Sequence, residues 1–307
     1  MSRAGAGATA PPHRRHAAAG YLVGAGACFG LLSFLVNPLA AAGVPVPAQV
    51  LLRVAVAAGL FQWRAAYGAG SGGRRLVWLN AACLVAAFWT FAQALALGVS
   101  PTVATALVYL YPVWYTLLTS LRQWRDSLGI RSGAAIAVGV LGAVLTTQFW
   151  RSTGSGGRWW LGVGLALANG LLLALTTLIA RRSAAAFPDT WQFARRSFEA
   201  ALLMCLVAAA VVVLVHPSLV VPQPDRLRPA ALLLVPAAGI VCTAAPYLLL
   251  YVGAARSRSA TDGTWLLSEP LVVAAVAVWR QPGSLDPGVV AGAGCIVLAA
   301  LVLLTGD

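Results

Sequence analysis

The sequence contains very little charge and no lysine. Charged residues occupy 9% of its 307 positions and hydrophobic residues 60%, and every one of the 21 Lys or Arg positions is an arginine. Without lysine, the chain has neither the phosphate-binding lysine of ATP-driven pumps nor any Schiff-base chemistry. A water-soluble fold of this length carries more charge on its surface. The composition therefore predicts that lipid surrounds most of the chain.

Histidine and cysteine are also scarce, and their spacing argues against a metal centre. The five cysteines lie in separate apolar segments, whereas zinc sites and disulfide frameworks need closely paired cysteines. The three histidines lie in the N-terminal tail and in a proline-rich loop, away from any acidic pair. We therefore expect no metal and no cofactor. The lack of clustered acid and base side chains argues against an enzyme, including one that acts on lipid-linked substrates.

Long apolar segments, by contrast, are abundant. About ten of them approach the length of roughly 20 residues that crosses a bilayer, and none alternates with period 2 as the strands of a β-barrel do. Because backbone polar groups in hydrocarbon must be satisfied within the segment, we predict an all-α integral membrane protein with ten transmembrane helices. The segments lie near residues 17–36, 48–62, 76–97, 102–121, 130–149, 159–180, 192–215, 229–253, 261–279 and 286–304.

Arginines between the segments indicate how the chain is oriented. They cluster before the first segment, after the second and between the fourth and fifth, whereas the loops at 37–48 and 98–101 have none. The positive-inside rule then places the tail at residues 1–16 in the cytoplasm, and ten crossings return the C-terminus to the same side. These clusters also account for the net charge of +13, so no nucleic-acid partner is expected. We predict a multi-pass protein of a bacterial inner membrane with both termini cytoplasmic.

The two halves of the chain look like copies. The segment that ends at Pro112 aligns without gaps on the segment that ends at Pro270, at an offset of 158 positions. The copies are predicted at residues 17–150 and 159–307, joined by a linker at 151–158. Because each copy has five helices, the second copy enters the membrane from the opposite side. Two inverted repeats with a substrate site between them are the architecture of alternating-access carriers.

Further features recur in the same order in both halves. Each half has an arginine in its second helix, a pair of small apolar residues before its fourth helix and a proline within that helix. The residues are Arg53, Ala96, Leu97 and Pro112 in the first half, and Arg195 or Arg196, Ala254, Ala255 and Pro270 in the second. Together they resemble the EamA-type drug/metabolite transporter superfamily over nearly the whole chain after residue 16. The resemblance implies a ten-helix secondary carrier of small metabolites or drugs.

The chain departs from that superfamily after the fourth helix of each repeat, where many members have a glutamate. Arg125 and Asp126 stand there in the first repeat, and Arg280 and Gln281 in the second. No role is therefore carried over for that acidic residue.

Positions related by the offset are expected to face one cavity between the repeats. Aromatic walls with a few polar groups suit a small amphipathic solute, such as an amino acid or an aromatic metabolite. The alternative is that these aromatic side chains only fill gaps between helices. The offset pairs Trp89 with Tyr247, Gln93 with Tyr251, Leu107 with Trp265 and Tyr111 with Glu269, and all of these except Leu107 are our predicted substrate-binding residues.

Glu269 is the residue with the strongest functional prediction. It lies near the centre of the ninth segment, where an ionised carboxylate is costly unless it is hydrated, paired or protonated. We predict that it couples transport to protons; the alternative is a structural hydrogen-bond acceptor between helices. Pro112 and Pro270 each remove a backbone hydrogen bond inside a segment, so both are predicted to kink their helices.

The arginines of the second and seventh segments have two open interpretations. Arg53, Arg195 and Arg196 are predicted near the membrane ends, where long side chains reach the headgroups. Alternatively they pair with a substrate carboxylate or, in the second repeat, with Glu199.

The leading hypothesis is a secondary active transporter that exports small amphipathic metabolites by alternating access. Its expected partners are the small-molecule substrate and membrane lipids, and glycines at spacing four are compatible with a monomer or a homodimer. A scaffold or sensor that transports nothing is the remaining alternative.

Overall fold

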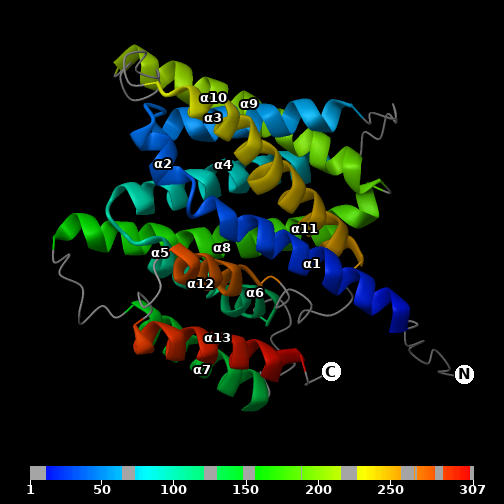
Figure 1. The fold of residues 1–307 in the computed structure, drawn as a ribbon. Coiled ribbons are helices and arrows are strands. Elements are labelled where there is room, and N and C mark those ends of the chain that lie inside the picture. The colour runs from blue at the N-terminus through cyan, green and yellow to red at the C-terminus, as the bar shows by residue number, and fades with distance from the viewer. Residues whose placement is uncertain are drawn as a thin grey trace, which may run out of the picture.

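The computed structural model describes residues 12–63, 73–120, 130–147, 156–187, 189–215, 227–256, 266, 268–280 and 286–304. Every regular element in these ranges is a helix (Figure 1). Most helices overlap the predicted apolar segments, but Val36–Ala41 is helical in the predicted loop 37–48, and the segment 102–121 is divided into two helices. The all-α class is therefore confirmed for this part of the chain. Five helical runs are long and apolar enough to cross a membrane, at residues 18–41, 74–96, 157–186, 190–214 and 233–256. The total of ten spans stays a prediction.

The helices of the first half begin with the long α1 and end with α7. Their bounds are α1 (Pro12–Leu32), α2 (Val36–Ala41), α3 (Val46–Gln62), α4 (Arg74–Ala96), α5 (Pro101–Val108), α6 (Tyr111–Ser120) and α7 (Ile130–Thr147). Those of the second half are α8 (Gly157–Ala186), α9 (Thr190–Val215), α10 (Pro229–Gly239), the π-helical turn η3 (Ile240–Ala244), α11 (Ala245–Arg256), α12 (Ser268–Arg280) and α13 (Pro287–Leu304).

Prolines explain where several of these helices begin or change. Pro101 is the first residue of α5, and the Ser100 side chain accepts a hydrogen bond from the Val103 N–H at 3.3 Å. A proline has no N–H to donate, so it fits the first turn of a helix and disrupts later turns. Pro246 accordingly follows the π-helical turn η3. Pro112 lies in the first turn of α6, directly after an interruption of the helix at residues 109–110, and Pro270 lies in the first turn of α12.

Helices from the two halves pack against each other in pairs. α1 packs against α11 and α12, and α8 packs against α4 and α5. α3 lies against α9, and α7 lies beside α13 at one edge of the bundle (Figure 1). The core formed in this way holds many fully buried alanines, which allow helices to approach closely.

The outer surface of the bundle is apolar. On α9, six large aliphatic side chains are exposed over about three turns: Leu203, Leu206, Val207, Val211, Val213 and Leu214. A continuous apolar face of this kind would be costly in water. Lipid chains around the helices would remove that cost, in agreement with the apolar composition.

Two glycines bring backbones of opposite halves into direct contact. A Cβ atom on Gly26 of α1 would lie 2.6 Å from the Leu266 carbonyl oxygen, and one on Gly170 of α8 would lie 2.8 Å from the Val108 carbonyl oxygen. Each of these carbonyls stands four residues before a proline, which cannot donate the helical hydrogen bond to it. The two contacts are thus equivalent, one in each half, and neither leaves room for a side chain.

Candidate substrate cavity

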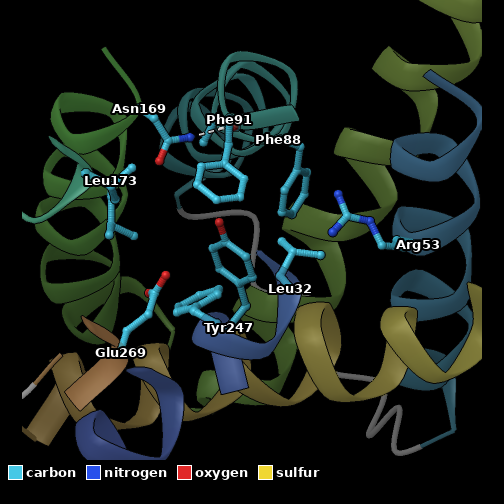
Figure 2. Close-up of a pocket in the computed structure, with 11 residues that line it drawn as sticks. Leu32, Arg53, Phe88, Phe91, Asn169, Leu173, Tyr247 and Glu269 are labelled. Atoms are coloured by element: carbon cyan, nitrogen blue, oxygen red, sulfur yellow. Dashed lines mark hydrogen bonds between the residues drawn. The ribbon is translucent and has the colours of Figure 1, made fainter. Parts of the chain in front are cut away.

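A cavity lies between the two halves and is lined by side chains from seven helices. Its volume of about 50 Å³ is room for a few water molecules, at roughly 10–15 Å³ each. Figure 2 shows Arg53 on one side of this space and Glu269 on the other, with aromatic rings between them. The lining residues are Phe29 and Leu32 of α1, Arg53 of α3, Ala87, Phe88 and Phe91 of α4, Val108 of α5, Asn169 and Leu173 of α8, Tyr247 of α11 and Glu269 of α12.

Tyr247 is the centre of the aromatic wall. Its ring meets those of Phe29 and Phe88 edge to face, with centroids 5.0 and 5.4 Å apart. Phe198 of α9 and Tyr251 of α11 complete its surroundings at 5.7 and 6.0 Å. Rings packed edge to face at these distances attract one another and restrict each other's rotation. The Tyr247 hydroxyl therefore has a fixed place, and Figure 2 shows it directed into the cavity.

Glu269 is buried in the first turn of α12 and accepts a hydrogen bond from the Tyr109 hydroxyl. The first turn of a helix has N–H groups without intrahelical partners and a positive dipole end, both of which favour a carboxylate. The neighbouring Ser268 donates from its hydroxyl to the Val23 carbonyl at 2.8 Å, which ties this turn to α1. The position of Glu269 is thus set by Tyr109 and by the packing of α12 on α1.

Arg53 is also buried, with 2% of its surface exposed. Its Nε donates to the Gln49 carbonyl at 3.3 Å, and its guanidinium carbon lies 5.7 Å from the centre of the Phe88 ring. Its Nη1 has no hydrogen-bond partner among the residues that the structure describes. Snorkelling to the headgroups does not fit such a side chain, because Arg53 lines the interior cavity.

The corresponding arginines of the second half lie in a different environment. Arg195 pairs with Glu199 on the next turn of α9, with Nε and Oε1 2.8 Å apart. The same carboxylate oxygen accepts a hydrogen bond from Gln62 of α3. The guanidinium of Arg196 lies over the Phe187 ring, 5.6 Å from its centre. Both side chains are half-buried and have protein partners.

Of the predicted substrate-binding residues, Tyr247 and Glu269 line the cavity. Tyr251 lies one turn further along α11, where its hydroxyl accepts a hydrogen bond from Asn80 Nδ2 at 2.7 Å. Tyr111 is fully buried at the start of α6, and its ring centre is 6.2 Å from that of Tyr115. Trp265 lies outside the described residues.

Trp89 and Gln93 do not line this cavity. Trp89 lines a smaller one between α3, α4 and α9, and Gln93 is half-buried. The burial patterns of α4 and α11 match at an offset of 159, not 158, and one residue turns a helix face by about 100°. At the offset of 159 the buried residues correspond as Phe88 with Tyr247, Ala92 with Tyr251 and Leu95 with Ala254.

Eight of the eleven lining residues, and Tyr109 beside Glu269, were absent from the sequence-based prediction, and three of these residues show why. Phe88 would have been predicted with the offset of 159, which pairs it with Tyr247. Asn169 donates to the Ala87 carbonyl at 2.5 Å, and its amide is a polar group inside the apolar segment 159–180, a signal that could have identified it. Tyr109 has no such signal, since only the folded chain brings it to Glu269.

Comparison with known proteins supports the fold without naming a function. No protein-family model matches the chain, and no curated protein matches it significantly. Among 29 matching chains of solved structures, one protein crystal structure superimposes with a TM-score of 0.67 at 20% identity, over 94% of this chain and 96% of its own. At that identity the likeness shows the fold alone. Fold and cavity thus define an all-helical protein with apolar outer faces and a charged internal cavity.

The hydrogen bond between Asn80 and Tyr251 gives a first testable prediction. Asn80→Ala removes the donor to the buried Tyr251 hydroxyl, and an unsatisfied buried hydroxyl costs about 1–3 kcal/mol. We expect a lower melting temperature of the purified protein in detergent. Adding Tyr251→Phe to Asn80→Ala removes the hydroxyl as well and is expected to restore part of the loss. The cycle compares the loss of stability that Tyr251→Phe causes in the unaltered protein and in Asn80→Ala. If the two losses are equal, the two side chains are not coupled.

Proposed function

We propose that the protein is a secondary active transporter of the EamA-type drug/metabolite superfamily and that it exports small amphipathic metabolites by alternating access. The observation that carries this proposal is the cavity. Helices of both halves enclose it, and it holds one guanidinium and one carboxylate among aromatic rings. A scaffold needs no such interior, because buried charges inside an apolar bundle are costly to maintain.

The pattern of helix contacts supports two repeats. Let α1 correspond to α8, α3 to α9, α4 to α11, α5 to α12 and α7 to α13. The contacts of α1 with α11 and α12 then become those of α8 with α4 and α5. The contacts of α3 with α9 and of α7 with α13 map onto themselves. These contacts between the halves survive the exchange, as expected for a duplicated unit with a twofold relation, and the odd number of predicted helices in each unit favours an inverted one.

The size of the cavity fits one state of a carrier cycle. A volume of about 50 Å³ is far below the roughly 300 Å³ at which small-molecule pockets begin, so this state encloses no metabolite. In alternating access the two repeats rock against each other around a site at their interface. Such rocking would widen the cavity toward one face and then toward the other.

Flux through a membrane tests the proposal against the scaffold or sensor alternative. In proteoliposomes with the purified protein, we expect labelled amphipathic solutes to exchange across the membrane, and faster when unlabelled solute is present on the other side. Liposomes without protein are the control. Absence of flux under any gradient, together with ligands that raise the melting temperature, would favour a sensor.

A further inference from the structure

Arg53 has more hydrogen-bonding capacity than the described part of the chain satisfies. Its side chain is 2% exposed, one donor is used by the Gln49 carbonyl, and Nη1 has no partner among the described residues. A buried charge without a counter-charge is strongly unfavourable inside a protein. The cost is offset if a ligand in the cavity completes the pairing.

The protein supplies no counter-charge on the same helix. In the second half, Arg195 is paired by Glu199 four residues later, whereas four residues after Arg53 the chain has the fully buried Ala57. The carboxylate among the cavity residues belongs to Glu269, and no ion pair joins it to Arg53. Figure 2 shows the two side chains on different sides of the cavity, with Tyr247 between them. Among the residues that the structure describes, Arg53 is thus a cation that faces the cavity without an acidic partner.

The surroundings of Arg53 restrict what can bind there. Phe88 lies against the guanidinium, and Phe91, Phe29 and Tyr247 continue the aromatic wall from it. A guanidinium donates to the planar oxygens of a carboxylate, and an aryl or alkyl group attached to that carboxylate would contact the rings. One guanidinium balances one negative charge, and Glu269 in the same cavity disfavours a dianion such as a phosphate monoester.

We propose that Arg53 is the anion subsite of the cavity and binds the carboxylate of a small apolar monocarboxylate, the class of solute that the protein carries. This rests on the proposed transport function for its biological meaning, but binding itself can be measured without transport. The guanidinium holds the carboxylate, and the aromatic wall holds the apolar part.

Benzoate and benzamide test this assignment, because they have nearly the same shape and differ in charge. In detergent-solubilised protein we expect benzoate to bind roughly 10- to 100-fold more tightly than benzamide, the range given by a charge-assisted hydrogen bond. Arg53→Gln is expected to remove that preference, and Arg53→Lys to retain part of it. Arg195→Gln, which alters a paired arginine outside the cavity, is the matched control and should keep the preference. Phenyl phosphate should bind more weakly than benzoate.

Three results would overturn the assignment. They are no preference for benzoate in the unaltered protein, an undiminished preference in Arg53→Gln, and tighter binding of phenyl phosphate than of benzoate. If Arg53→Gln does not fold, the comparison of Arg53→Lys with the unaltered protein decides, since a purely structural role would not distinguish ligands by charge. Binding that depends on Arg53 without any flux in proteoliposomes would refute the transport function and leave the subsite standing. Flux in proteoliposomes together with an unchanged preference for benzoate in Arg53→Gln would support the transport function and refute the subsite.

Discussion

Gly170→Ala is expected to destabilise the protein severely, although alanine is normally the better residue in a helix. The added methyl group would lie 2.8 Å from the Val108 carbonyl oxygen and 3.4 Å from that of Leu107, so α8 or the end of α5 would have to move. Overpacking of this kind costs about 1–3 kcal/mol, and more where the obstacle is backbone. We expect a marked fall in melting temperature and in the yield of monodisperse protein in detergent. Gly26→Ala should behave in the same way, because its methyl group would meet the Leu266 carbonyl.

The same two helices provide matched controls for these variants. A Cβ on Gly164 of α8 or on Gly20 of α1 would have nothing within 4 Å. Gly164→Ala and Gly20→Ala are therefore expected to leave stability unchanged or to raise it by up to about 1 kcal/mol. If Gly170→Ala were as stable as Gly164→Ala, the close contact between the halves would be wrong, and the equivalence of the two glycine contacts would lose its physical basis.

Glu269→Gln is expected to abolish accumulation of substrate driven by a pH gradient while leaving the fold intact. Glutamine has nearly the same shape and can still accept the hydrogen bond from Tyr109, so the start of α12 keeps its packing on α1. What the variant loses is the group that can exchange a proton inside the cavity. Exchange of solute without a gradient should persist, because it needs no net proton movement. The measurement compares gradient-driven accumulation with exchange in the same proteoliposomes.

Glu199→Gln is the matched control for Glu269→Gln. Glu199 is a partly exposed carboxylate on α9, paired with Arg195 outside the cavity, so its replacement should leave the response to a pH gradient unchanged. Continued accumulation by Glu269→Gln under a pH gradient would show that another group couples transport. In that case Glu269 would be a structural acceptor for Tyr109, the alternative that the sequence left open.

The helices were the most predictable part of the structure. In hydrocarbon a segment must satisfy its own backbone, so an apolar run near 20 residues long has few alternatives to a helix. Most of the described helices overlap the predicted segments for this reason, whereas α2 lies in the loop predicted at 37–48. The effect of the prolines on the helices was less predictable. Pro112 and Pro270 were expected to kink their helices; the segment that contains Pro112 is interrupted at residues 109–110, and both prolines lie in the first turn of a helix, where a missing N–H has no cost.

Two of the predicted substrate-binding residues, Tyr247 and Glu269, line the cavity, and the different place of Trp89 has a geometric cause. An alignment of the copies that is correct around Pro112 and Pro270 is one residue out of register between α4 and α11. That shift turns the helix face by about 100°, so the sequence pointed to Trp89 where the structure places Phe88. Tyr247 and Glu269 were identified through the offset between the copies, and Glu269 also because it is a carboxylate inside an apolar segment. The burial of Arg53 could not be predicted, since an arginine one turn into a helix also reaches the headgroups.

Chemical labelling of the cavity from both sides of the membrane tests the central claim most directly. Leu173 of α8 lines the cavity and is 6% exposed, so a reagent would reach a cysteine there only when the cavity opens. In a variant with the five native cysteines replaced, the account predicts that Leu173→Cys reacts with a membrane-impermeant maleimide added to either face of sealed vesicles, and more slowly when a transported solute is present. Reaction from one face alone, under every condition, would contradict a cavity that opens alternately to the two sides.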